Sequence, residues 1–292
     1  MSSPARAVID LEAPACPVDV LAQTGAGTGR LAVARVDGQS AVVACAAASP
    51  LHLFTPRPRG AAVWAVATTH GGGVLAGDHI DLEVDVGLGA GAIVATQSNT
   101  RVYRSSGAVA TQRLRASIAS AAALAVLPEP TAPFAGSRYQ QEQRFALEPG
   151  GSLLFVDAVT EGRGARGERW AFDSYASRLE VEVGGRLVLA DAIRLLAGEG
   201  AAPVDRMEGV AMMATVVALG PALAGGARRI LAERSSAAAE PAAQVLAAAS
   251  PIADGIHLRM AASSIAAGLA YIRATLAFAA PLFGGAPFDH RP

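Results

Sequence analysis

The chain has 292 residues, and 52% of them are hydrophobic, which is enough to bury a large core and too many for a disordered protein. The formal net charge is −1, and the 24 basic residues are all arginines scattered along the chain, so the sequence lacks the basic footprint of nucleic-acid binding. Without lysine there is no Schiff-base chemistry and no Walker A loop, so any GTP hydrolysis must come from a partner.

The same features predict a cytoplasmic protein that does not span a membrane. The two cysteines, Cys16 and Cys45, lie far apart in the sequence and form no paired framework, as is typical of a reducing compartment. Charged residues and prolines interrupt the N-terminal residues, which argues against a secretory signal. The longest uncharged run, residues 210–227, contains glycines and a proline, which favours a buried strand and a turn over a membrane helix.

Residues 1–28 are predicted to be an N-terminal tail, and residues 29–292 one domain. Residues 31–36 and 41–46 predict a hairpin around Asp37 and Gly38. Strict alternation over residues 79–86 predicts a half-buried strand whose outer face carries His79, Asp81, Glu83 and Asp85. Glycines then interrupt the pattern before a returning strand at residues 92–96.

Strand patterns continue at residues 113–118 and 152–156, and a second hairpin is predicted over residues 178–190 with Gly184 and Gly185 at its turn. Residues 198–209 are predicted to form an exposed loop. Helices are predicted at residues 241–249 and 263–279, the second of which starts at a serine cap and ends before Pro281. No internal repeat is evident.

One glycine-rich tract suggests a hydrolase. His70, Gly71, Gly72 and Gly73 are similar to the oxyanion-hole loop of some lipases and esterases, in which backbone N–H groups face a developing negative charge. That chemistry needs a nucleophile, and the sequence contains no Gly-x-Ser-x-Gly elbow. A small-molecule esterase that uses this loop is therefore the alternative hypothesis, and a β-structured, lectin-like binding module is a third.

Residue type and spacing indicate which residues are candidates for metal binding and for partner recognition. Among His70, His79, His257 and His290, no two have the i, i+4 spacing that places two ligands on one helix face, so no preformed structural metal site is predicted. The acidic row of Asp81, Glu83 and Asp85 could attract a cation, although a solvated strand face is the favoured interpretation. Residues 161–170 combine charges, glycines and an aromatic, which makes Arg163, Arg166 and Trp170 candidates for partner binding.

Several long, irregular motifs occur together in the chain. They are residues 71–78, which end in Asp78, residues 96–105, residues 127–134, residues 162–170, and Asp191. In this order they resemble the urease accessory protein D family, also called UreD or UreH, from about Gly29 onward. Two departures are Arg101, where many relatives carry lysine, and residues 288–292, where relatives carry a tryptophan.

The resemblance implies a mainly β fold with a β-helical or stacked-sheet architecture and a small C-terminal helical part. It also implies a scaffold and chaperone that is not an enzyme, has no catalytic residues and holds no resident cofactor. Such a protein binds apo-urease and a helical accessory protein of the UreF type. Through the latter it recruits a GTP-hydrolysing nickel chaperone of the UreG type, so that nickel and carbon dioxide reach the urease active site.

A protein that handles nickel only transiently must shield a hydrated cation and then release it. Weak oxygen ligands along a polar tunnel meet this demand better than a tight cage. The polar residues in or beside the matching motifs are therefore predicted to contribute to a nickel path, with no confident metal ligand among them: Asp78, Thr96, Ser98, Asp157, Glu168 and Asp191.

Overall fold

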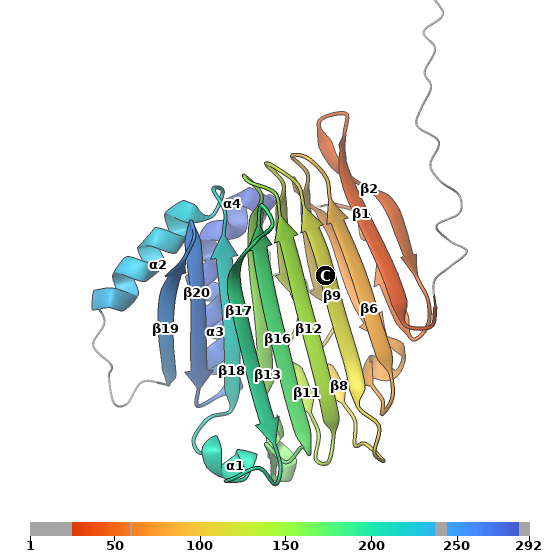
Figure 1. Ribbon diagram of the computed structural model, residues 1–292, viewed down its shortest axis with the longest axis vertical. Helices are drawn as coiled ribbons and strands as arrows, with labels where there is room; N and C mark the ends of the chain where they lie inside the picture. The colour runs from red at the N-terminus through yellow and green to blue at the C-terminus, as the bar shows by residue number, and fades with distance from the viewer. Residues whose placement is uncertain (1–24, 59, 237–243, 286–292) are drawn as a thin grey trace, which may run out of the picture.

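Two large β-sheets lie face to face in the computed structural model, which describes residues 25–58, 60–236 and 244–285 (Figure 1). Figure 1 views the outer face of the seven-stranded sheet, sheet A, with the other sheet behind it. Its strands, in spatial order, are β17 (Arg186–Leu196), β16 (Ser174–Val183), β12 (Arg138–Leu147), β9 (Ala110–Ile118), β6 (His79–Val86), β1 (Thr28–Val36) and β2 (Gln39–Ala47).

The second sheet, sheet B, has eleven strands. Its main path is β19 (Val245–Ile252), β20 (Gly255–Ala262), β18 (Met212–Leu219), β13 (Ser152–Thr160), β10 (Ala123–Leu127), β7 (Gly91–Thr96), β4 (Val63–Thr69) and β3 (Leu51–Phe54). Three short strands lie off this path: β5 (Gly73–Val74), β8 (Thr100–Val102) and β11 (Thr131–Pro133). Of these, β11 pairs with β13 and β8, and β8 also pairs with β5. A separate ribbon pairs β14 (Gly162–Arg163) with β15 (Glu168–Arg169).

The chain passes back and forth between the sheets. The strands β6, β9 and β12 enter sheet A, and the strand after each of them, β7, β10 or β13, enters sheet B, with parallel neighbours in both sheets. The corners stack as well, because Ala119 N donates to Val86 O at 2.9 Å and Glu148 N donates to Ile118 O at 2.8 Å. This coiled path is β-solenoid-like and confirms the predicted β-helical, stacked-sheet architecture.

Alternating strands supply the core between the sheets. On β6, Ile80, Leu82 and Val84 are buried, as the sequence pattern predicts. Aromatic contact joins the sheets, since the Phe145 ring on β12 and the Phe155 ring on β13 lie with their centroids 5.0 Å apart. Both predicted hairpins are present as well, β1–β2 and β16–β17.

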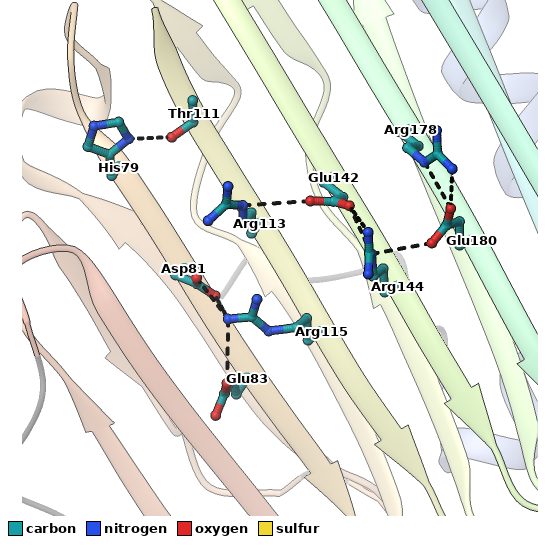
Figure 2. A network of polar contacts seen from close by, with 10 residues as sticks. All are labelled: His79, Asp81, Glu83, Thr111, Arg113, Arg115, Glu142, Arg144, Arg178 and Glu180. Atoms are coloured by element: carbon teal, nitrogen blue, oxygen red, sulfur yellow. Dashed lines mark hydrogen bonds and ion pairs between the residues drawn. The ribbon is translucent and has the colours of Figure 1, made fainter. Parts of the chain in front are cut away.

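The outer face of sheet A carries a network of ion pairs that crosses its strands (Figure 2). Arg115 on β9 pairs with Asp81 at 2.9 Å and with Glu83 at 3.5 Å, and Arg30 on β1 pairs with Asp85 at 3.2 Å. Neighbouring strands thus neutralise the acidic row, which supports its interpretation as a solvated face. Because these groups are exposed, each pair contributes little to stability.

Helices α2 (Ala224–Ser236) and α3 (Ile265–Leu276) contact the last strands of sheet B, β18, β19 and β20, and α4 (Ala280–Phe283) follows α3 in the chain (Figure 1). The predicted helix near residue 263 is confirmed, with Ser264 as its cap because Ser264 Oγ accepts a hydrogen bond from Ala267 N at 3.2 Å. By length and composition, the helical stretch Ile265–Phe283 could cross a membrane. In this fold Ile272, Leu276 and Phe283 pack into the same apolar cluster as β18 and β20.

Two sequence expectations need correction. The prediction of a helix at residues 241–249 is wrong from residue 245 onward, because the strand β19 occupies Val245–Ile252. Residues 241–243 lie outside the described part of the chain. Pairing with β20 outweighs the helix propensity of its alanines. The loop expected at residues 198–209 contains a short helix, α1 (Pro203–Arg206). The predicted tail lies outside the described residues except for residues 25–28.

A polar belt between the sheets

A row of polar side chains crosses the otherwise apolar space between the sheets. On sheet A, Gln112, Gln141 and Ser177 stand directly opposite one another on β9, β12 and β16. On sheet B, Asp157 on β13 stands opposite Thr215 on β18. We call these five residues, together with Asp191 on β17, the polar belt. Gln141, Ser177, Thr215 and Asp191 are all buried.

Asp157 is the centre of the belt. Its Oδ2 accepts hydrogen bonds from Gln141 Nε2 at 2.6 Å and from Ser177 Oγ at 3.1 Å, so residues of sheet A hold a carboxyl that sheet B supplies. Burial raises the pKa of Asp157 above its usual range, and these hydrogen bonds offset only part of that effect. Among the ion pairs of the described residues, none includes Asp157, so its charge has no cationic partner there.

Three cavities that share lining residues lie in sequence between Asp157 and the surface. The innermost has a volume of about 60 Å³ and is lined by Thr96, Gln112, Gln141 and Asp157, among others. A second, of about 40 Å³, shares Thr96 and Gln112 with it and adds Ser98. Thr96 and Ser98 also line a surface recess of about 570 Å³. Since one water needs roughly 10–15 Å³, the inner cavity has room for a few waters.

Asp191 marks the far end of the belt and differs from Asp157 in its charge partners. Arg259 forms an ion pair with Asp191, and Thr215 Oγ1 donates to Asp191 Oδ2 at 3.4 Å. His257 Nε2 lies 3.3 Å from the same oxygen, and burial lowers the pKa of His257, which favours the neutral ring. Asp191 is therefore a compensated carboxylate, whereas Asp157 is not.

The belt and cavities bring together Thr96, Ser98, Asp157 and Asp191 from the predicted path. Asp78 lines none of these three cavities, and its Oδ2 accepts a hydrogen bond from Leu75 N at 2.8 Å that closes a turn before β6. Glu168 accepts hydrogen bonds from Arg163 Nε at 2.8 Å and Nη2 at 2.6 Å, and these bonds lower its pKa. Glu168 therefore holds Arg163, which lines the recess.

The three partner-binding candidates occupy different environments. The Arg163 guanidinium lies 4.3 Å from the centroid of the Phe134 ring at the recess, and Arg166 is exposed. Trp170 is 1% exposed, and its Nε1 donates to Val210 O at 2.7 Å. The expectation that Trp170 lies on a partner-binding surface is therefore wrong, because its large apolar ring is packed in the core.

Sequence reasoning missed Gln112, Gln141 and Ser177. Neutral amides and hydroxyls do not titrate near pH 7, so a search for charged or nucleophilic groups passes over them. A signal was nonetheless present in β12. Gln141 and Gln143 share the inward face with Tyr139 and Phe145, which makes them polar interruptions of an apolar row.

The loop of the hydrolase alternative is a short turn, His70–Gly72, and the ring that contacts His70 is that of His52. A serine or cysteine in that place would be the signature of an activated nucleophile. An imidazole paired with a second imidazole is not. The structure therefore gives the esterase alternative no support.

The raised pKa of Asp157 makes a prediction about pH and stability. Since the folded carboxyl holds its proton to higher pH than the unfolded one, its favourable contribution is complete below the unfolded pKa and is lost as pH rises through the folded pKa. Asp157→Asn is expected to remove this loss and so to raise the unfolding free energy at pH 7 relative to the wild type. Urea denaturation of both proteins at pH 4 and pH 7 measures the effect, and a gain as large at pH 4 would contradict it.

The fold and the belt together define a class: a β-solenoid-like protein with a series of cavities lined by hydroxyls, amides and charged residues, Asp157 among them. Comparison with known proteins makes this specific. A model of the UreD urease accessory protein family matches residues 25–291, which is nearly the whole chain. The chain belongs to that family.

Individual relatives agree with the family match. The chain is 55% identical to a urease accessory protein UreD of Anaeromyxobacter sp. over 91% of this chain and 90% of that protein. It is 44% identical to the corresponding protein of Sorangium cellulosum over 91% of this chain and 84% of that one. A urease accessory protein D of Arabidopsis thaliana is 30% identical over 89% of this chain and 99% of its own length.

Proposed function

We propose that this chain is a urease maturation factor: a scaffold without catalytic activity that binds apo-urease and other accessory proteins and lets nickel pass through its interior. The observation that carries the proposal is the series of cavities from the surface recess to Asp157, whose carboxyl has no cationic partner among the described ion pairs. Family membership supplies the urease context.

The residues that line the cavities suit a cargo better than a resident metal. Thr96, Ser98 and Gln112 offer neutral oxygens, and Asp157 offers a carboxylate to the innermost cavity, which Arg113 and Glu142 also line. Hydroxyl and amide oxygens are weak ligands for a borderline cation such as Ni²⁺, which prefers imidazole and thiolate, so exchange with water stays fast. Burial raises the pKa of Asp157, so a proton competes with an arriving cation for its carboxylate.

Partners belong to the same proposal. A helical accessory protein of the UreF type and, through it, a GTP-hydrolysing nickel chaperone of the UreG type would deliver the cation, and apo-urease would receive it. Arg163 lines the recess and Arg166 is exposed in the turn that follows it, and these are the side chains proposed for partner contact. The proposal places these events in the cytoplasm and requires neither a membrane nor nucleic acid.

Co-expression tests the proposed role directly. Urease subunits and the other accessory proteins are produced with and without this chain, and the purified urease is assayed for bound nickel by metal analysis and for urea hydrolysis. We expect little nickel and little activity when the chain is left out, because nickel then lacks its path. Full activation without it would refute the proposal.

A further inference from the structure

Two histidines meet on the hairpin formed by β3 and β4. His52 on β3 stands opposite Thr68 on β4, so His70, two residues beyond Thr68, is its diagonal neighbour on the same face. The two Nε2 atoms lie 2.8 Å apart, with ring centroids 4.2 Å apart and ring planes at 75°. The pair therefore joins residues 18 positions apart through strand register.

The backbone holds both rings in place. Strand pairing fixes His52, and His70 N donates to Pro50 O at 3.1 Å. After His70 the chain turns through Gly71 and Gly72, with φ of 77° and 66°, values that glycine adopts without steric cost. Tyr103 Oη donates to Gly71 O at 3.2 Å and secures the turn.

The two nitrogens are spaced as metal ligands. Imidazole nitrogens bind at about 2.0–2.1 Å, so two of them at right angles around one cation are separated by about 2.8–3.0 Å. Without a cation, a hydrogen bond joins the two Nε2 atoms, and a cation would take the place of its proton. His70 is exposed and His52 half-buried, which leaves the remaining coordination positions open to water.

We propose that His52 and His70 form a two-nitrogen binding site for a first-row divalent cation of the Ni²⁺, Cu²⁺ and Zn²⁺ group, which imidazole favours. Neither histidine lines the three cavities that lead to Asp157. Their neighbours Leu51, Thr69 and Gly72 do line the second cavity, so the histidine pair lies beside the oxygen-lined passage and is not part of its lining. The proposal does not depend on the proposed function. Arg101 lies beside the turn, with its Nη1 3.8 Å from the point that a Cβ on residue 72 would occupy. Its positive charge opposes tight binding of a cation.

The test uses the purified full-length chain with NiCl₂ or CuCl₂ alone. Equilibrium dialysis of the wild type is expected to show a histidine-dependent site of one cation per chain, and electron paramagnetic resonance of bound Cu²⁺ to show coupling to two imidazole nitrogens. His52→Gln and His70→Gln are each expected to weaken that site at least tenfold. Absence of imidazole coupling in the wild type overturns the proposal without recourse to any variant.

Matched controls separate this site from other histidines and from the passage. His79→Gln removes an exposed ring that is hydrogen-bonded to Thr111, and His290→Gln removes one beyond the described residues; both are expected to bind as the wild type does. Asp157→Asn is likewise expected to leave this site unchanged, even though it impairs urease activation. Thermal melting shows whether His52→Gln and His70→Gln are folded. If both are folded and bind the cation as tightly as the wild type does, the proposal is overturned.

Discussion

Replacing Asp157 with alanine is expected to lower the nickel content and activity of co-expressed urease about tenfold while the accessory complex still assembles. The change removes a carboxylate that lines the innermost cavity, together with the acceptor of the hydrogen bonds from Gln141 and Ser177. The expected factor corresponds to the loss of about 1.4 kcal/mol of interaction between the cation and the carboxylate. Metal analysis of urease and pull-down of the complex measure the two expectations separately.

Two companion variants sharpen this experiment. Asp157→Asn keeps the shape and removes the charge, so it should impair activation nearly as much as alanine does. Glu168→Gln is expected to cost less than threefold, because Glu168 is engaged by Arg163 and acts on the recess through that residue. Equal activation by wild type and Asp157→Ala would exclude a nickel path past Asp157, and loss of the complex would assign the residue to assembly.

Replacing Trp170 with alanine is expected to lower the unfolding free energy of the chain by about 3–5 kcal/mol, as large-to-small changes in a packed core do. The ring is 1% exposed, its centroid lies 6.2 Å from that of Phe172, and its N–H is hydrogen-bonded to Val210 O. Urea denaturation followed by circular dichroism gives the change in midpoint.

Arg166→Ala serves as the control for Trp170, because an exposed side chain in the same segment should change stability by no more than about 0.5 kcal/mol. Trp170→Phe keeps most of the apolar ring and loses the hydrogen bond, so its cost should fall between the two. An unchanged midpoint for Trp170→Ala, combined with weaker partner binding, would restore the surface interpretation that the sequence suggested.

The local sequence pattern predicted strands well where one face of the strand is exposed to solvent. Alternation over residues 79–86 reports burial directly, and the Gly184–Gly185 turn defines a hairpin without knowledge of the rest. Alanine-rich segments are harder, because alanine favours a helix in isolation yet fits a strand when a neighbour supplies hydrogen bonds, as β20 does for β19. The coiled path was implied by family resemblance alone, since its coils differ too much in sequence to read as a repeat.

The candidate site was predicted in part for a related reason. Thr96, Ser98, Asp157 and Asp191 were found because they lie beside strand motifs, but which of them meet depends on how the two sheets face each other. Trp170 misled because its flanking charges resemble a recognition surface. His52 and His70 are joined by a diagonal across two strands, and a search for helical ligand spacing cannot detect that arrangement.

The alternation of strands between sheets also has a consequence for synthesis. Sheet A has supplied all of its belt residues once β17 with Asp191 is made, whereas Thr215 arrives only with β18. A nascent chain that has not yet made β18 leaves β13, with its apolar run at residues 153–156, as an open sheet edge, and such edges recruit other chains. A chain that terminates before residue 212 is thus expected to aggregate and to accumulate in the cell as insoluble protein.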